Sequence, residues 1–241
     1  MKISIVIPAF NEERLLAETL RHINQARTAF DALAVESELI VCDNNSTDRT
    51  AEIARAAGAT VVFEPVNQIG RARNTGAAAA SGEWVIFVDA DTHPSAGLLT
   101  EVVETIRIGK VLAGGCVIRL QGEHRVARCV TWFWNCVSRS RRLVAGSFIF
   151  VDAAAFRQVG GFDQQFYAGE ELDLAKRLHR LARATGREIV ILHRHPILTS
   201  DRKVRLYSPW EHLRFFIRGV FSPRRVLRDK EACHAWYDGR R

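Results

Sequence analysis

The chain has few cysteines and no long hydrophobic run, and both absences narrow what it can be. Its 5 cysteines among 241 residues are odd in number and scattered, without a CxxC pair, so neither a disulfide framework nor a zinc site is indicated. No apolar stretch approaches the roughly 20 residues that span a bilayer. The apolar run at residues 3–7 is too short for the core of a signal peptide, and the acidic residues Glu12 and Glu13 follow it too soon. We therefore expect a cytoplasmic protein.

The chain also lacks a glycine-rich segment after its first predicted strand. The residues that follow this strand are Pro8-Ala9-Phe10-Asn11, where a dinucleotide-binding protein would carry G-x-G-x-x-G. This absence argues against a nicotinamide-dependent oxidoreductase, the enzyme class that an alternating α/β pattern would otherwise favour. We also find no internal repeat and no low-complexity tract, so a second folded domain is not expected.

The first half of the chain alternates short apolar runs with helical patterns. Nearly continuous apolar runs predict buried strands, and they lie at residues 3–7, 39–42, 61–63 and 84–88. One helix is predicted after Asn11, and two more are predicted at residues 47–57 and 71–80. Gly58 and Gly82 are the expected ends of the second and third helices. Such an order predicts a mostly parallel sheet, which binds ligands beyond the carboxyl ends of its strands.

The second half is less regular. It predicts helices near residues 95–106 and 170–184, strands near 115–120, 147–151 and 188–192, and an aromatic segment at 126–137. We expect one domain over residues 1–205, with halves of about 1–110 and 111–205, followed by a basic amphipathic tail over 206–241. The net charge of +7 is concentrated in the last quarter, which suits an anionic partner.

Two carboxylates follow the strand predicted at residues 84–88. Asp89 and Asp91 stand one residue apart at its carboxyl end. Uncompensated charge beside an apolar core is costly, and a hard divalent ion would hold both groups ionised while leaving sites for a diphosphate. The alternative is that Asp91 only caps the helix that follows Pro94.

Two neighbouring strands end in polar loops as well. The first runs into Pro8–Glu12 and the second into Asp43-Asn44-Asn45-Ser46-Thr47-Asp48. An acid or amide at these ends can bind a ribose hydroxyl or a base edge. For Ser46 and Asp48 we favour capping of the helix that begins near Thr47.

Four segments together resemble family 2 glycosyltransferases. They are Ser4–Glu12, Asp43–Asp48, Gly70-Arg71-Ala72-Arg73-Asn74-Thr75-Gly76 and Asp89-Ala90-Asp91, in the order found in that family. The resemblance covers roughly residues 1–205. It implies an α/β fold of the GT-A type: a mostly parallel, Rossmann-like sheet flanked by helices, with a mixed acceptor-side half.

The resemblance also implies roles for these residues. The nucleoside of the donor would lie on Pro8, Ala9, Phe10, Glu12 and Asp43. Arg73 and Ala90 would lie near the donor and Asp89 near its ribose, and Asp91 would hold Mn²⁺ or Mg²⁺.

An acid pair in the second half is the candidate general base. Gly169-Glu170-Glu171 opens the helix predicted at 170–184, after Gly160-Gly161. The segment resembles the acceptor-side motif of the family, in which Glu-Asp commonly begins the helix and the second acid is the base. Glu171 stands where Asp is usual, so the choice between Glu170 and Glu171 stays open. Acids in a first helical turn also stabilise the helix dipole without any catalytic role.

The tail offers further candidates. His195 could join the metal, and Arg202 and Lys203 could contact the diphosphate. After Tyr207, a helical apolar stripe flanked by arginines suits either an anionic membrane or packing on the domain, and the aromatic segment around Trp132–Trp134 has the same two interpretations.

Together these features predict a metal-dependent, inverting glycosyltransferase. It would move a sugar from a nucleotide-diphosphate donor to a saccharide or lipid-linked hydroxyl, with peripheral contact at the inner face of the membrane and no nucleic-acid partner. A sugar nucleotidyltransferase is the alternative, although its glycine-rich signature is missing. A basic nucleic-acid-binding module is less favoured, because acids at strand ends repel phosphate.

Overall fold

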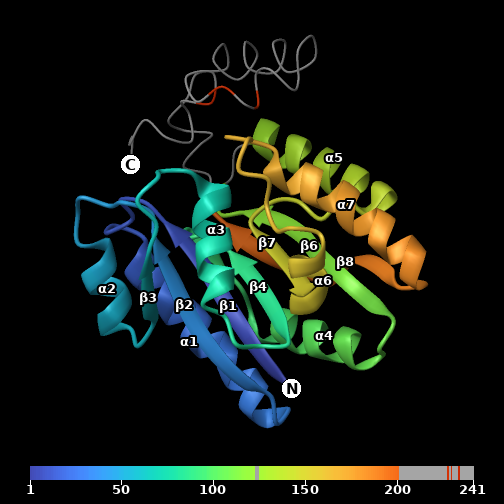
Figure 1. The fold of residues 1–241 in the computed structure, drawn as a ribbon, viewed down its shortest axis with the longest axis horizontal. Helices are drawn as coiled ribbons and strands as arrows, with labels where there is room; N and C mark the ends of the chain where they lie inside the picture. The colour runs from blue at the N-terminus through green and yellow to red at the C-terminus, as the bar shows by residue number, and fades with distance from the viewer. Residues whose placement is uncertain (123–124, 201–226, 228, 230–232, 234–241) are drawn as a thin grey trace.

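The computed structural model describes residues 1–122, 125–200, 227, 229 and 233 (Figure 1). Its strands are β1 (Lys2–Ala9), β2 (Glu36–Asp43), β3 (Thr60–Phe63), β4 (Trp84–Val88), β5 (Thr92–His93), β6 (Val111–Leu120), β7 (Phe148–Asp152) and β8 (Glu188–Thr199). Its helices are α1 (Leu16–Ala32), α2 (Thr50–Ala56), α3 (Ile69–Ala78), α4 (Ala96–Arg107), α5 (Arg125–Arg141), α6 (Ala153–Gln158) and α7 (Glu170–Thr185).

All of these strands join one sheet, in the order β3-β2-β1-β4-β7-β6-β8-β5. The strands β1 to β4 run parallel to their neighbours among themselves. β7 is antiparallel to both β4 and β6, whereas β8 is parallel to β6 and antiparallel to β5. The predicted α/β class, with a parallel first half and a mixed second half, is confirmed.

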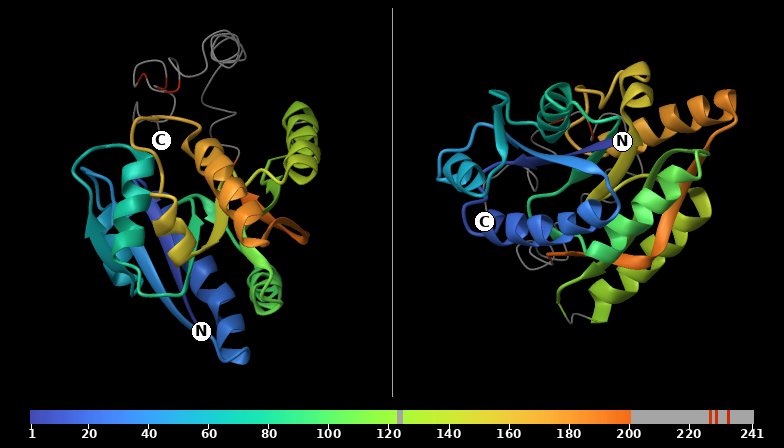
Figure 2. Two further views of the ribbon diagram at one scale, coloured as in Figure 1. Left: turned by 45° about the vertical axis from the view of Figure 1, so that its right-hand side comes forward. Right: turned by 90° about the horizontal axis from the view of Figure 1, so that it is seen from below.

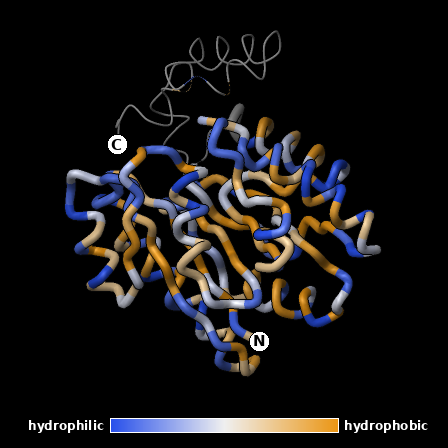
Figure 3. The backbone as a smooth tube through the Cα atoms, in the orientation of Figure 1, coloured by the Kyte–Doolittle hydropathy of each residue, from blue (hydrophilic) through white to orange (hydrophobic). Residues whose placement is uncertain are grey.

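Helices cover both faces of this sheet (Figure 2), and its central strands are hydrophobic along most of their length (Figure 3). Successive side chains of a strand point to opposite faces. On β1, Ile5 and Ile7 belong to the hydrophobic cluster that includes α1 and α4, while Val6 belongs to the cluster that includes α6 and α7. The two clusters hold the carboxyl ends of β1, β2 and β4 at one edge.

The structure corrects several details of the predicted elements. β6 begins at Val111 and not at 115, α2 begins at Thr50 and not at 47, and the aromatic segment at 126–137 lies in the helix α5. β8 does not stop at Leu192: after an irregularity that contains Pro196, its pairing with β6 resumes at Ile197. α3 ends at Ala78 and not at Gly82, which instead lies against β1, where an added Cβ would be 2.7 Å from Ser4 N. Gly58, in contrast, has the positive φ of 80° expected just after a helix.

Several predictions fall wholly or partly outside the described residues. The tail over 206–241, with its apolar stripe, and the domain boundary near 205 stay predictions. Among the helices that the structure does describe, none combines the length and hydrophobicity needed to cross a membrane.

Candidate active site

The loops that follow β1 and β2 are hydrogen-bonded to each other. Asn44 N donates to Ala9 O at 2.8 Å, and Asn11 N donates to Ser46 Oγ at 3.0 Å. Asn11 has a positive φ of 51°, and its side-chain Oδ1 accepts from Thr47 N at 2.8 Å. Asparagine tolerates this left-handed conformation better than most residues. The two loops therefore form one wall at the carboxyl edge of the sheet.

The residues predicted to hold the nucleoside lie in this wall. Ala9 of β1 is paired in register with Asp43 of β2, and Pro8, Ala9, Glu12 and Asp43 are buried, with Phe10 half-buried. Asp43 accepts a hydrogen bond from Ser46 N at 3.0 Å, which holds its loop tightly folded. The structure thus brings these five residues together.

Asp48 fixes the start of α2. Its Oδ1 accepts from Thr50 N at 2.9 Å, and its Oδ2 accepts from Glu13 N at 3.1 Å. Partial burial raises the pKa of Asp48, but the hydrogen bonds from Thr50 and Glu13 outweigh it and the net pKa is lowered. The N-cap of α2 is Arg49, which makes no side-chain cap hydrogen bond, so Asp48 holds the helix start from the residue before the N-cap. Ser46 accepts its hydrogen bond from Asn11 N and does not cap the helix.

A buried guanidinium joins the two halves of the chain. Arg73, on α3, is 2% exposed. Its Nη2 donates to Asp89 Oδ1 at 2.9 Å, while its Nη1 donates to Glu170 Oε1 at 2.8 Å and to Glu171 Oε1 at 3.3 Å. One cation thus lies among three carboxylates, one from the end of β4 and two from the start of α7. These carboxylates raise the pKa of Arg73, although its burial acts in the opposite direction.

The two acids of α7 have different surroundings. The Glu170 side chain is 2% exposed and that of Glu171 is 19% exposed. Burial, reinforced by the neighbouring Glu171, raises the pKa of Glu170 to about 8 despite the ion pair with Arg73. Glu170 is therefore a buried partner of Arg73, while Glu171 is the partly exposed acid of the pair.

α3 holds the loop before α7 through two residues that the sequence analysis did not single out. Gln68 Nε2 donates to the carbonyls of Gln164 and Phe166, both at 2.7 Å. Asn74 donates to Phe162 O at 2.8 Å and accepts from Phe162 N at 2.9 Å. Asn74 lies within the segment Gly70–Gly76 that carries the resemblance, so its motif membership was the available signal. Nothing in the sequence pattern pointed to Gln68.

Asp91 and Ala90 form the turn after β4, with Ala90 buried and Asp91 half-buried. The side chain that caps α4 is Ser95, whose Oγ accepts from Leu98 N at 3.1 Å. The capping alternative for Asp91 is therefore wrong. Asp91 stays a predicted metal ligand, two residues from the Asp89 that Arg73 holds.

His195 lies apart from this cluster. Its exposed ring covers Gly97 near the start of α4, where an added Cβ would be 2.7 Å from His195 Cε1. His195 stands four residues before Thr199, and Thr199 pairs with Thr92 of β5. The structure does not bring it into the group formed by Arg73, Asp89, Glu170 and Glu171. Arg202 and Lys203 lie outside the described residues.

Known proteins match this chain in sequence and in fold. The sequence model described as Glycosyl transferase family 2 matches residues 4–159. An uncharacterized glycosyltransferase of Mycobacterium tuberculosis is 35% identical over 143 residues, which are 58% of this chain and 61% of that protein. The match thus spans less than two thirds of that relative's length.

Two solved structures share the fold over almost the whole chain. Staphylococcus aureus TarS, residues 1–349, in complex with UDP-GlcNAc has a TM-score of 0.67 at 20% identity, covering 98% of this chain and 69% of that one. The mannosyltransferase PcManGT from Pyrobaculum calidifontis, in complex with GDP-Man and Mn²⁺, has a TM-score of 0.66 at 21% identity, covering 97% and 68%.

The family match covers well over half of the chain and includes β1 from Ser4 onward, the Arg73 segment and the Asp89–Asp91 turn. The mixed sheet and the solved structures agree with it in fold. The chain belongs to glycosyl transferase family 2 and has the GT-A fold.

Proposed function

We propose that this protein transfers a sugar from a nucleotide-diphosphate donor to an acceptor hydroxyl, with inversion at the anomeric carbon. The observation that carries the proposal is the position of Arg73. It connects Asp89, at the strand end expected to meet the donor, with Glu170 and Glu171, at the helix start expected to meet the acceptor. A transferase needs both ends of the reaction side by side.

The donor would lie across the wall formed after β1 and β2. The half-buried Phe10 supplies an apolar side chain there, above the buried Pro8 and Ala9. The carboxylates of Glu12 and Asp43 can accept hydrogen bonds from a nucleoside. UDP-GlcNAc in TarS and GDP-Man in PcManGT support a nucleotide-diphosphate sugar as the class of donor.

The carboxylates near Arg73 suit a divalent ion. Asp89 and Glu171 outnumber the single guanidinium between them even when Glu170 holds its proton, and Asp91 adds a further carboxylate nearby in the chain. Mg²⁺ and Mn²⁺ prefer oxygen ligands, and a diphosphate completes such a site. We assign the ion to Asp91, since Asp89 is held by Arg73. A bound ion would stabilise negative charge on the departing diphosphate. The Mn²⁺ of PcManGT supports this assignment.

Glu171 is the proposed general base. It can accept the proton of the acceptor hydroxyl as that oxygen attacks the anomeric carbon and the bond to the nucleotide diphosphate breaks. The partly exposed Glu171 can meet an acceptor, whereas Glu170 is enclosed and hydrogen-bonded to Arg73. Glu170 would then position Arg73, and Arg73 in turn would position Glu171.

Donor binding provides the first test. UDP-, GDP- and dTDP-sugars are screened for thermal stabilisation with and without Mn²⁺, because a ligand of the folded state raises apparent stability. Asp91→Asn should abolish the Mn²⁺-dependent part, while Asp31→Asn, at an exposed position on α1, should leave it unchanged. Equal Mn²⁺-dependent stabilisation of parent and Asp91→Asn would refute the metal assignment.

Turnover with an identified donor and acceptor tests the base. Glu171→Gln should lower kcat by about 10²–10⁴-fold with donor affinity nearly intact. Glu52→Gln, at an exposed site on α2, is the matched control. Normal turnover by Glu171→Gln together with a large loss in Glu170→Gln would move the role to Glu170. A product of retained configuration would reject the single displacement, and a new sugar nucleotide made from a nucleoside triphosphate would indicate a nucleotidyltransferase.

α5 supports a peripheral contact with an anionic membrane, where a lipid-linked acceptor would lie. Val130, Trp132 and Phe133 are 62%, 68% and 64% exposed. The helix carries no acidic residue but has arginines, including Arg128 and Arg139. Aromatic and basic groups on one helix suit an anionic lipid surface.

Sedimentation with vesicles decides this point. Binding to anionic vesicles should exceed binding to neutral ones and should fall in Trp132→Ser/Phe133→Ser. Phe63→Ser, which removes an aromatic ring that is 58% exposed elsewhere, serves as the control. No preference for anionic lipid would refute the contact.

A further inference from the structure

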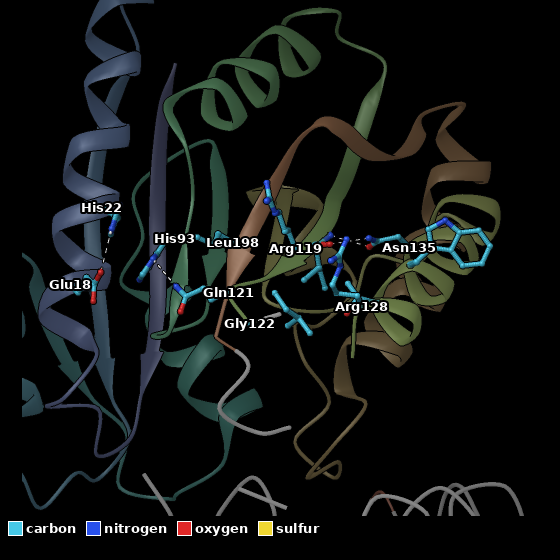
Figure 4. Close-up of a pocket in the computed structure, with 13 residues that line it drawn as sticks. Glu18, His22, His93, Arg119, Gln121, Gly122, Arg128, Asn135 and Leu198 are labelled. Carbon is cyan, nitrogen blue, oxygen red and sulfur yellow. Dashed lines mark hydrogen bonds and ion pairs between the residues drawn. The ribbon is translucent and has the colours of Figure 1, made fainter. Parts of the chain in front are cut away.

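A second group of metal-ligating side chains lies outside the Arg73 cluster. Glu18 and His22 belong to α1, and His93 belongs to β5 (Figure 4). One ligand atom from each of the three lies within 4.8 Å of the other two. In the part of the chain that the structure describes, no other group of three His, Cys, Asp or Glu residues meets this condition.

The backbone places these three groups together. Glu18 and His22 are four residues apart, so they project from the same face of α1, with Glu18 Oε1 3.7 Å from His22 Nε2. α1 packs beside β5, and the rings of His22 and His93 stack with centroids 4.3 Å apart and planes 17° apart. An imidazole holds a metal in the plane of its ring, so binding of one ion by both histidines requires the rings to turn out of this stack. Both histidines are half-buried and Glu18 is exposed, so an ion could reach the group from solvent.

Hydrogen bonds orient both rings. Arg21 Nη2 lies 2.9 Å from His22 Nε2, and because a guanidinium only donates, this nitrogen carries a lone pair. Gln121 Nε2 lies 3.2 Å from His93 Nδ1. Rotation of the Gln121 amide would let its oxygen accept from Nδ1–H, which leaves the lone pair of Nε2 for a metal. Gln121 would then orient His93 as partners of metal-ligating histidines commonly do, whereas Arg21 occupies the lone pair of His22 Nε2 and an ion bound there would displace it.

We propose that Glu18, His22 and His93 bind a transition-metal ion of the Zn²⁺ class. Two imidazoles and one carboxylate suit Zn²⁺ better than Mg²⁺ or Mn²⁺, which favour all-oxygen ligands. Three protein ligands leave a fourth position open. The group borders a cavity of about 850 Å³ that also includes Arg119, Gln121 and Arg128, so water or a small anion can occupy that position.

This ion would be separate from the one assigned to Asp91. His93 follows Asp91 by two residues, but it lies in β5 beside α1, whereas Asp89 of the same segment is bound to Arg73 on α3. A metal bridge between α1 and β5 would tie the strand after the Asp89–Asp91 turn to the helix that covers it. It should stabilise the folded chain without nucleotide.

Zn²⁺ binding to the full chain, measured without nucleotide by competition with a chromophoric chelator, tests the proposal. We expect one Zn²⁺ per chain. Its affinity should fall at least about tenfold in each of His22→Gln, His93→Gln and Glu18→Gln. His193→Gln, at an exposed histidine outside the group, should bind like the parent. Asp91→Asn should also keep this ion, which separates the site from the proposed donor-metal site.

Arg21→Gln gives a change of opposite sign. It removes a cation and a competing donor from His22 Nε2, so Zn²⁺ should bind more tightly than in the parent. Co²⁺ substitution provides a second readout, since visible absorption of a low-symmetry Co²⁺ centre should appear in the parent and vanish in His22→Gln. Absence of bound Zn²⁺ in the parent, or binding that the three ligand substitutions leave unchanged, would overturn the proposal. Binding lost only in Cys129→Ser/Cys136→Ser would do so too.

Discussion

Replacing Arg73 by Met should destabilise the fold by an amount that grows with pH. Met has a similar length and can keep the apolar part of the contact with Phe162, over whose ring the guanidinium carbon lies at 5.2 Å. What the substitution removes is the positive charge among Asp89, Glu170 and Glu171. Three carboxylates would then share one partly buried place without a compensating cation.

The expected loss is about 3–5 kcal/mol near neutral pH, the usual effect of removing one partner of a buried ion pair. That is a large share of the about 5–15 kcal/mol that stabilises a typical domain. Without Arg73, Glu170 loses the cation that lowers its pKa, so this pKa, already raised by burial, rises further above the unfolded value. The protonated form of Glu170 fits the folded state, so stability is retained at low pH and is lost as pH rises through the raised pKa. The loss should therefore be smaller at pH ~5 than at pH ~8.

Urea unfolding measures the effect, because urea does not screen charges as guanidinium salts do. Adding Glu170→Gln to Arg73→Met removes one of the three acids and should recover about 0.5–3 kcal/mol, the range of coupling between contacting residues. The double variant also provides a folded sample if the single one is too unstable. A loss below about 1 kcal/mol, or a loss that is equal at both pH values, would refute the electrostatic argument.

Three further predictions test the packing and the titration of the site. Gly76→Ala would place a Cβ 2.4 Å from Val6 Cγ1 and should cost about 1–3 kcal/mol in urea unfolding; an unchanged midpoint would show that β1 can yield there. Asn74→Ala leaves Phe162 N and O without their partner and should lower the free energy of unfolding by about 1–3 kcal/mol. Asn74→Asp keeps an oxygen that can accept from Phe162 N, so a loss as large as that in Asn74→Ala would contradict a role for this hydrogen bond. Burial raises the pKa of Glu170 to about 8, so the parent should lose stability by up to about 1.4 kcal/mol per pH unit as pH rises from ~5 to ~8, and Glu170→Gln should flatten that slope. Parallel pH profiles of parent and variant would show that Glu170 stays ionised.

Most of the fold could be predicted because its signals are local. The run Trp84–Val88 is apolar at every position, and β4 has these bounds. α7 begins at Glu170, as expected from the glycine before it and the acids in its first turn. β8 was predicted too short, because Pro196 suggests the end of a strand. In the fold it lies in an irregularity, after which pairing with β6 resumes.

The candidate site was predictable only in part. Acids at successive strand ends could be counted along the chain, and a parallel sheet brings such ends to one edge. Asn11 and Thr47 meet for this reason. The roles of Gln68 and Asn74 could not be derived in this way, since each holds a loop about 90 residues further along the chain.

The sequence by itself determined the fold class, the family and the set of acids available for catalysis, because each depends on residue type and short-range spacing. Only the tertiary structure decided which of those acids is enclosed and which is partly exposed. Glu170 and Glu171 are adjacent in the chain, but their different directions from α7 leave one enclosed against Arg73 and the other partly exposed. Arg73 reaches Glu170 across 97 positions, and His22 stacks on His93 across 71, because two packed layers bring distant segments within side-chain reach. Local sequence periodicity does not predict such contacts, since they depend on how the helices pack over the sheet.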